Sequence, residues 1–397
     1  MEIAKIERPL AERIFIWLSY PVFLAILVVL AAVAIPGSAL ITKAYDYLLG
    51  LIPVSWSWLQ YLILTFVPVL AITIGVLLAA IVLIWWERRV IALFQIRRGP
   101  NRMGLFGVFQ PIVDAIKILF KEDIVPQKVD WILFTLAPIL IFVPGLVAYI
   151  VIPFSKEWIG ADLRVGILFL LAVISLTSIS LVMAGWASNN KYSLMGGMRA
   201  VAQTISYEVA MIMAVIGVII LAGSLNLVDI VNNQNVWGFI KQPLGFVIFF
   251  TCGLAEINRI PFDLPEAESE LVAGFSTEYS GFKFALFYVA DYVDSFLISM
   301  LTAVLFFGGW RFPFDTLLNN WMVGDVGMGT FLNDHFGIFI LLAKTFFFFS
   351  CIVWIRGTYP RLRTDQLMTF SWKVLLPLAF ANIFITAIYA SWKFGMF

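Results

Sequence analysis

The sequence has very little histidine and cysteine, and this scarcity excludes most resident redox chemistry. Its 397 residues contain one histidine, His335, and two cysteines, Cys252 and Cys351. One imidazole cannot supply the four axial ligands of a two-haem cytochrome b, and two distant cysteines form no CxxC pair. The chain also lacks GxxxxGK[ST] and GxGxxG motifs, which leaves nucleotide binding without support. We therefore expect no cofactor and no metal bound by this chain, and any redox centre would belong to a partner or to a mobile small molecule.

Charged residues are scarce as well, whereas hydrophobic residues dominate. The chain is 62% hydrophobic and 13% charged, with a mean hydropathy of +0.96. This composition lies far outside the range of soluble domains and predicts an integral membrane protein. The net charge of +1 favours neither a nucleic-acid partner nor a polybasic lipid anchor.

Long apolar runs predict an all-α membrane protein with about nine transmembrane helices. Five charge-free runs exceed or approach the roughly 20 residues that cross a hydrocarbon core of about 30 Å: 14–36, 61–86, 131–154, 165–187 and 374–392. Three more runs carry ionisable residues: 200–222, 284–308 and 336–355. The ninth begins at Pro243 and has to continue to about Phe262 to span the bilayer, which places Glu256 and Arg259 at membrane depth. Eight spans remain the alternative if 14–36 lies along the membrane surface.

The chain divides into two predicted segments, an N-terminal extension at 1–58 with one extra helix and a membrane domain at 59–397. No internal repeat and no Gly/Ser-rich linker divides the second segment. Most lysines and arginines fall on segments that lie inside when the N-terminus is inside. The positive-inside rule therefore predicts a multi-pass protein with its N-terminus inside, and in a bacterium that side is the cytoplasm.

The loop 87–130 contains "ERRVIALFQIRRGPNRMGLFGVFQPIVDAIKILFKEDIVP". Its second half spaces apolar residues at helical intervals opposite Asp114 and two lysines, which predicts an amphipathic interfacial helix near 108–121. Its first half gathers arginines around Gly99 and Pro100. This basic turn is either ordinary positive-inside anchoring or the rim of an access path for an apolar ligand with a polar head.

Five ionisable residues fall within or near the expected spans, where a charge costs on the order of 2.5–3.5 kcal/mol. They are Glu208, Glu256, Asp291, Asp294 and Lys344. One interpretation is that such residues pair and hold helices together, as Glu256 and Arg259 would at a spacing of three. The other is a proton relay, which suits Glu208 because no cation lies near it in the sequence.

The stretch "GLAEINRIPFDLPEAESELVAGFSTEY", residues 253–279, holds six of the 25 acidic residues and one basic residue. A solvated acidic loop at 261–282, on the cytoplasmic side, is one interpretation. Apolar and aromatic residues interleave the acids, however, and favour a partly buried carboxylate cluster. Such a cluster takes up or loses protons when a nearby charge changes.

Several motifs resemble those of one family, the H subunits of bacterial NADH–quinone oxidoreductases, which are the ND-one-type membrane subunits of respiratory complex I. They are the loop motif beginning "ERRVIALFQIRRGPNRMG", "AGWASNNKYSLMGGMRAVAQTISYEVA", "AEINRIPFDLPEAESELVAGFSTEYSGFKFALF" and "KTFFFFSCIVWIRGTYPRLRTDQLM". The resemblance covers about residues 65–310 and 336–392. It implies an eight-helix core with one additional N-terminal helix, in a chain that acts as part of a proton-translocating enzyme.

The resemblance also implies partners and a mechanism. Two soluble subunits would complete a quinone chamber, one of them carrying the terminal iron–sulfur cluster. Further membrane-arm subunits would pump protons, FMN and iron–sulfur clusters would stay in partners, and lipids would surround the chain. Quinone, such as ubiquinone, would be the substrate. Its reduction would change the charge in the chamber, and this change would pass to the membrane arm.

Two sets of site residues follow from the resemblance. Those expected to bind quinone are Arg88, Arg97, Arg259, Tyr288 and Tyr292. Those expected to relay protons or charge are Asp114, Glu208, Glu256, Asp263, Glu266, Glu268, Glu270, Glu278 and Asp291.

The chain also departs from the family pattern, and the departures inherit no role. These are the segment 1–58, the long outer loop 309–335, and Asp294, which stands where the family does not usually carry an acid. Asp291 replaces a typical glutamate. The sequence leaves open the quinone, the electron donor and whether this chain itself conducts protons. The alternatives are a related ferredoxin- or hydrogenase-linked complex, a stand-alone proton-coupled transporter and a passive membrane anchor.

Overall fold

The computed structural model describes residues 57–156, 158–234, 236–265, 268–312, 322–323 and 326–393. The chain divides into two compact units, Met1–Val67 and Pro68–Phe397. The second unit holds every described candidate site residue. The extra helix predicted at 14–36 lies outside the described residues, so the structure does not test it.

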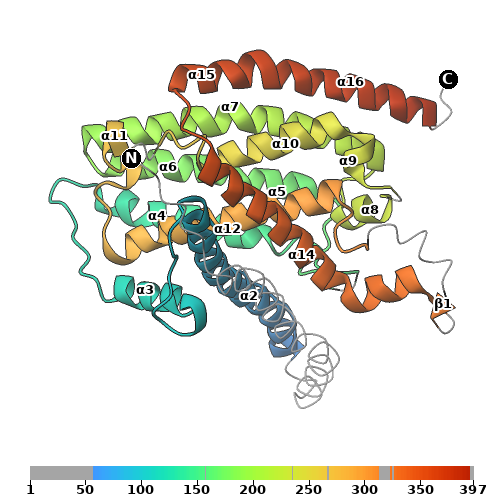
Figure 1. The fold of residues 1–397 in the computed structure, drawn as a ribbon, viewed down its shortest axis with the longest axis horizontal. Helices are drawn as coiled ribbons and strands as arrows, with labels where there is room; N and C mark the ends of the chain where they lie inside the picture. The colour runs from blue at the N-terminus through green and yellow to red at the C-terminus, as the bar shows by residue number, and fades with distance from the viewer. Residues whose placement is uncertain are drawn as a thin grey trace, which may run out of the picture. The chain divides into compact units, whose positions relative to one another are not determined.

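Helices make up most of the described chain, as Figure 1 shows. The elements are α2 (Ser57–Phe94), η2 (Leu105–Gly107), α3 (Gln110–Leu119), α4 (Trp131–Ala148), α5 (Gly166–Ile174), α6 (Leu176–Ala187), α7 (Lys191–Ala222), α8 (Leu227–Asn232), α9 (Gly238–Lys241), α10 (Pro243–Glu256), α11 (Glu268–Leu271), η3 (Gly274–Ser276), α12 (Gly281–Phe306), β1 (Met322–Val323), β2 (Val326–Gly327), α14 (Met328–Thr358), α15 (Thr364–Phe370), η4 (Ser371–Leu375) and α16 (Leu376–Lys393). The strands β1 and β2 form a two-residue antiparallel ladder within the predicted outer loop 309–335.

Within the described residues, seven helical segments are long and apolar enough to cross a membrane, and the helix Pro243–Glu256 is a shorter apolar one. The long segments are Phe66–Phe94, Trp131–Ala148, Gly166–Ala187, Lys191–Ala222, Gly281–Phe306, Phe336–Thr358 and Thr364–Trp392. Together with the short helix they match the eight predicted runs after residue 58. The prediction of an all-α integral membrane protein is confirmed, whereas the count of nine is not.

Helix α12 is the most enclosed of these segments. In its apolar window 83% of the residues are buried, compared with 22–44% in the other six. It packs against α4, α14 and α10. Its buried hydroxyls donate to backbone carbonyls four residues earlier, with Ser299 to Ser295 at 2.7 Å and Thr302 to Ile298 at 2.7 Å. These bonds satisfy polar groups that would otherwise be costly to bury.

Helix α10 ends earlier than predicted, at Glu256 instead of near Phe262. The backbone leaves the helix because Asn258 adopts a left-handed conformation with φ of 55°, which asparagine tolerates better than most residues. The side chain of Gln203, on α7, holds the irregular segment that follows. Its amide donates to the carbonyl oxygens of Ala255 at 2.8 Å and Phe262 at 2.6 Å. Gln203 is fully buried, so these bonds fix the segment against α7.

The amphipathic helix predicted near 108–121 is present as α3, with Pro111 in its first turn. Its apolar side chains face outward: Phe109 is 55% exposed, Ile116 49% and Leu119 59%. An exposed apolar face on a short helix is typical of a helix that lies in the membrane interface.

The turn η3 lies against helix α7 with almost no space between the two backbones. A Cβ atom added to Gly196 would lie 2.7 Å from the Cα atom of Gly274 and 2.7 Å from the amide nitrogen of Phe275. Only glycine permits this approach. The hydroxyl of Ser193 donates to the carbonyl oxygen of Phe275 at 3.0 Å, and Phe275 belongs to the main hydrophobic core.

Lys344, within α14, binds backbone carbonyls that follow the end of α12. Its ammonium nitrogen donates to the carbonyl oxygens of Phe307 at 2.7 Å, Gly309 at 2.8 Å and Arg311 at 2.6 Å. These carbonyls come directly after the C-terminus of α12, where a cation also matches the helix dipole. Lys344 thus joins α14 to the backbone that follows α12.

Candidate functional site

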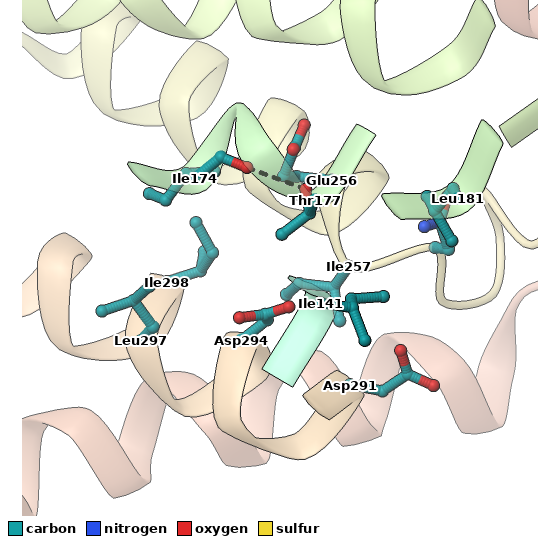
Figure 2. A pocket seen from close by; sticks show the side chains of 11 residues that line it. Ile141, Ile174, Thr177, Leu181, Glu256, Ile257, Asp291, Asp294, Leu297 and Ile298 are labelled. Atoms are coloured by element: carbon teal, nitrogen blue, oxygen red, sulfur yellow. Dashed lines mark hydrogen bonds between the residues drawn. The ribbon is translucent and has the colours of Figure 1, made fainter. Parts of the chain in front are cut away.

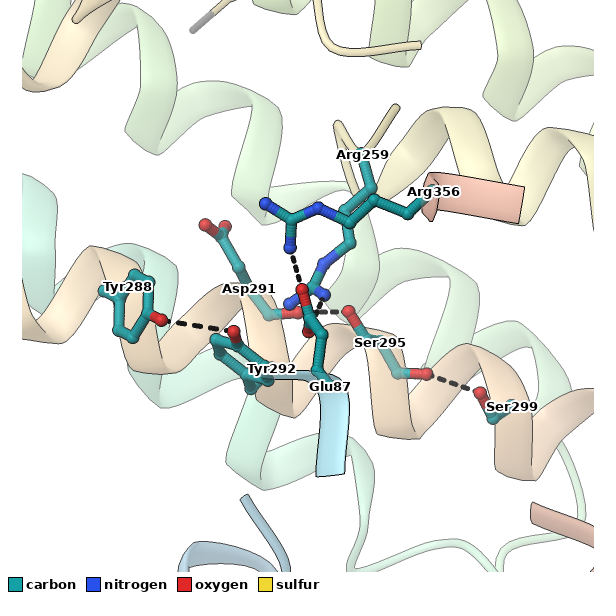
Figure 3. Close-up of polar contacts among 8 residues, drawn as sticks. All are labelled: Glu87, Arg259, Tyr288, Asp291, Tyr292, Ser295, Ser299 and Arg356. Carbon is teal, nitrogen blue, oxygen red and sulfur yellow. Dashed lines mark hydrogen bonds and ion pairs between the residues drawn. The ribbon is translucent and has the colours of Figure 1, made fainter. Parts of the chain in front are cut away.

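A buried carboxylate, Glu87, receives two arginines from distant parts of the chain (Figure 3). Glu87 lies on α2 and is 2% exposed. Arg259, after α10, donates to its Oε2 atom, and Arg356, on α14, donates to its Oε1 atom. The guanidinium of Arg259 also lies over the ring of Tyr292, 4.3 Å from the ring centre. This cluster joins α2, α12 and α14 around one carboxylate.

The predicted pair of Glu256 and Arg259 is therefore wrong. The spacing of three residues would bring the two side chains together on a continuous helix. The helix ends at Glu256, and the left-handed Asn258 lies between the two residues. Burial by itself would lower the pKa of Arg259, but the neighbouring Glu87 outweighs it and raises the pKa above its ordinary value. Arg259 accordingly stays charged.

Three of the predicted quinone residues line one cavity, which we call the arginine cavity. Arg259, Tyr288 and Tyr292 form its wall with Arg356, and the hydroxyls of the two tyrosines lie 3.1 Å apart. The remaining lining residues are Ile257, Asn258, Ile260, Asp263, Phe275 and Asp291. Positive charge, phenol groups and apolar side chains thus meet in the same space.

Arg88 and Arg97, the other two predicted quinone residues, lie elsewhere. Arg88 forms an ion pair with Asp114 of α3 and also interacts with Tyr288, so it links the amphipathic helix to α12. Burial would raise the pKa of Asp114, but hydrogen bonds from Arg88 and Gln110 outweigh it and hold this pKa below its ordinary value. Arg97 is exposed and donates to Gln95 at 2.6 Å, so the structure does not bring it to the cavity.

A second cavity adjoins the first, and we call it the acidic cavity (Figure 2). Glu256, Asp291 and Asp294 line it, and none of its eleven described lining residues is basic. The apolar part of its wall comes from α4, α5, α6 and α12. Three residues, Ile257, Asn258 and Asp291, line both cavities. The irregular segment after α10 and one acid of α12 therefore lie at the junction.

Glu208 and Glu256, the two predicted relay glutamates, have different surroundings. Glu208, on α7, accepts a hydrogen bond from the hydroxyl of Ser175. Both carboxyl oxygens of Glu256 are buried and have no hydrogen-bond partner among the described residues. A buried carboxyl group without partners is unusual, since most buried polar atoms are hydrogen-bonded.

The described acids of the loop 261–282 bind separate partners. Asp263 pairs with Arg361 at 3.0 Å, Glu270 pairs with Arg199, and Glu278 accepts from the amide of Asn190 at 2.6 Å. Asp263 is 9% exposed, whereas Glu270 is exposed. The side chain of Glu268 and the whole of Glu266 lie outside the described residues, so the structure does not test whether these acids belong to the predicted cluster.

Sequence reasoning missed Glu87, Arg356 and Gln203. Glu87 and Arg356 both stand in motifs that carried the resemblance, directly before Arg88-Arg89 and within "WIRGTYPRLR". A carboxylate next to an arginine pair at the end of an apolar run was the available signal for Glu87. Gln203 had no signal of its own, because its partners lie 52 and 59 residues away.

These features define a multi-pass membrane protein with a polar, charge-lined interior between its helices. Its sequence matches the NADH dehydrogenase family over residues 67–387, and the chain belongs to this family.

Curated relatives support the same assignment. One from Dehalococcoides mccartyi (strain CBDB1) is 48% identical over 312 residues, which cover 79% of this chain and 83% of the relative. One from Brevibacillus brevis is 47% identical over 344 residues, which cover 86% of this chain and 97% of the relative. One from Geobacillus kaustophilus is 48% identical over 329 residues, which cover 81% of this chain and 94% of the relative. All three are named as the H subunit of NADH-quinone oxidoreductase, so the resemblance inferred from the motifs is confirmed.

Proposed function

We propose that the chain is the membrane subunit of a proton-pumping NADH–quinone oxidoreductase that forms the membrane side of a quinone chamber. In this proposal it also passes the charge change of quinone reduction toward the membrane arm. The observation that carries the proposal is the pair of adjoining cavities, one lined by arginines and tyrosines and the other by acids, with Asp291 in both walls.

The arginine cavity has the chemistry that quinone reduction requires. A quinone headgroup gains negative charge on reduction, and cationic or phenolic donors placed where this charge develops stabilise it. Arg259 supplies a buried guanidinium, while Tyr288 and Tyr292 supply hydroxyl groups. In this proposal a lipid-soluble ligand from the bilayer would pass the apolar face of α3 and the Arg88–Asp114 pair.

The acidic cavity has the chemistry for the second step. Carboxyl groups close to one another titrate as a coupled set, so a charge that appears beside Asp291 alters the proton occupancy of its neighbours. The protonation of Asp291 would change first, then that of Glu256, and then that of Glu208 on α7. Asp263, Glu266, Glu268, Glu270 and Glu278 would adjust at the cytoplasmic rim.

The proposed partners are those of the oxidoreductase for which the relatives are named. Among the described residues, no group of three or more His, Cys, Asp or Glu side chains could hold a metal ion. Electrons would come from FMN and iron–sulfur clusters in other subunits, and two soluble subunits would close the chamber above the membrane. The chain would lie in the bacterial inner membrane with its N-terminus in the cytoplasm.

Substitution of Arg259 by lysine tests the role of the arginine cavity. Lysine keeps the charge but loses the planar guanidinium that contacts both Glu87 and the ring of Tyr292. In the purified complex we expect quinone reduction by NADH to fall by about tenfold or more, the effect of about 1.4 kcal/mol. Electron transfer from NADH to an artificial acceptor upstream of quinone should stay unchanged.

The matched control is Arg363→Lys, at an arginine whose side chain is 78% exposed and pairs with Asp365. Both activities should survive this change. Full quinone reductase activity of the Arg259→Lys complex would contradict a quinone site in the arginine cavity.

A further inference from the structure

The acidic cavity contains a carboxyl group for which the proposed relay has no role, that of Asp294. It lies on α12 one turn after Asp291 and faces the same space as Glu256 (Figure 2). Helix α4 approaches it closely: a Cβ atom added to Gly145 would lie 2.9 Å from the Oδ1 atom of Asp294. A glycine at this point of α4 thus leaves the room that the carboxyl group occupies.

The surroundings of Glu256 call for a donor that the cavity wall does not supply. Both of its carboxyl oxygens are buried and have no hydrogen-bond partner among the described residues. The hydroxyl of Thr177, in the same wall, already donates to the carbonyl oxygen of Ile174 at 2.8 Å. No basic side chain lines the cavity within the described chain. Two ionised carboxylates here would lack compensation, which is costly in a buried space.

A water molecule between the two carboxyl groups would supply the missing donor, and the cavity that both residues line has room for one. When one carboxyl group is protonated, its O–H donates to this water and the water donates to the other carboxylate, so the two acids hold one proton between them. Paired acids that share one proton titrate together, and the pair rather than either residue sets the behaviour.

We propose that Asp294 is a proton-binding group that shares one proton with Glu256 in the acidic cavity. The inference rests on the proposed charge relay and adds a carboxyl group to it. With one proton the pair carries a single negative charge, and a second proton neutralises it. Other titratable groups near the pair are Asp291, Glu208, Cys252 and Tyr149, whose hydroxyl donates to the carbonyl oxygen of Val293 at 2.6 Å.

The experiment compares Asp294→Asn and Glu256→Gln in the complete complex, reconstituted in lipid vesicles. Two quantities are measured: protons moved per quinone reduced, and the infrared difference spectrum between the oxidised and the quinone-reduced enzyme. A shared proton gives carboxyl bands that belong to both residues, so each variant should alter the same bands. The number of protons moved per quinone reduced should fall in both variants.

The control is Asp229→Asn, at an exposed acid of α8 that accepts a bond from Ser224 at 2.8 Å. Its spectrum and its proton transfer should match the unmodified enzyme. If Asp294→Asn does not assemble, Asp294→Glu keeps the carboxyl group on a longer side chain, and its carboxyl bands should shift.

Unchanged bands and full proton transfer in the assembled Asp294 variant would overturn the inference. If Glu256→Gln still lost proton transfer in that case, the proposed relay would stand without Asp294. If both variants kept full proton transfer, the relay through this cavity would fall as well.

Discussion

The substitution Glu87→Gln should destabilise the packing of α2, α12 and α14, which meet at this residue. It removes the charge that holds Arg259 and Arg356, and leaves an amide whose N–H groups face one of the guanidinium groups. The side chains of Glu87 and Arg259 are 3% and 6% exposed, so this pair is a buried one. Removing one partner of a buried ion pair costs about 3–5 kcal/mol. Arg356 is 34% exposed, and solvent screening reduces its share to about 1 kcal/mol or less.

The comparison variant is Asp365→Asn, which breaks an ion pair whose side chains are 78% and 69% exposed. An exposed pair of this kind contributes about 0–1 kcal/mol. The assay is the temperature at which the purified complex loses quinone reductase activity, together with the amount of assembled complex in membranes. We expect a clear loss in both for Glu87→Gln and almost none for Asp365→Asn.

A double variant separates the ion pair from other effects of the glutamate. In the double variant Glu87→Gln with Arg259→Gln, both charges of the pair are removed, so neither residue remains as a buried charge without its partner. The double change should therefore cost less than the sum of the two single changes, as coupled residues do in a double-mutant cycle. Equal stability of Glu87→Gln and Asp365→Asn, or strict additivity in the cycle, would refute the assignment of Glu87 as the central counter-ion.

Three further predictions concern the residues around the site. Gln203→Leu leaves the buried carbonyls of Ala255 and Phe262 without their hydrogen-bond donor, which costs about 1–3 kcal/mol each. Hydrogen exchange of residues 256–265 should therefore increase. Unchanged exchange would count against Gln203 as the residue that anchors this segment. Lys344→Met removes three hydrogen bonds to residues 307–311, so proteolysis at this loop should increase. If the variant resists proteolysis as well as the unmodified protein does, the role of the lysine is contradicted. Burial would raise the pKa of Asp114, but this pKa lies below its ordinary value because Arg88 and Gln110 stabilise the carboxylate. The stabilisation by Arg88 is therefore complete at any pH above the ordinary pKa, and it is lost only when the pH falls through the lowered pKa of the folded protein. The protection of α3 from hydrogen exchange, corrected for the intrinsic exchange rate at each pH, should therefore stay constant between about pH 7 and pH 5 and be lower throughout in Asp114→Asn. A loss of this protection in the unmodified protein over the same range would refute the sign.

Features that depend on local pattern were predictable from the sequence. Apolar runs of about 20 residues located the described spans, and the helical spacing of Phe109, Ile112 and Ile116 located α3. Both signals lie within one helix, so no knowledge of the packing was needed. The motifs likewise identified Arg259, Tyr288 and Tyr292, which line one cavity.

Features that depend on packing between helices were not predictable. Glu87 lies 172 residues from Arg259 and 269 residues from Arg356, and nothing along the chain specifies which carboxylate pairs with which arginine. The predicted pair of Glu256 and Arg259 assumed a helix that continued, whereas the conformation of Asn258 depends on the tertiary bonds made by Gln203. Local spacing misled here because the helix ended between the two residues.

The backbone contact between Gly196 and Gly274 has a mechanical consequence. The two chain segments touch so tightly that η3 cannot slide inward, and the hydroxyl of Ser193 resists its withdrawal. A displacement of the loop at 274–276 would drag the first turns of α7 along, and α7 carries both Gln203 and Glu208. Motion of the loop at 274–276 and motion at Glu208 are thereby coupled through two residues that have no side chains.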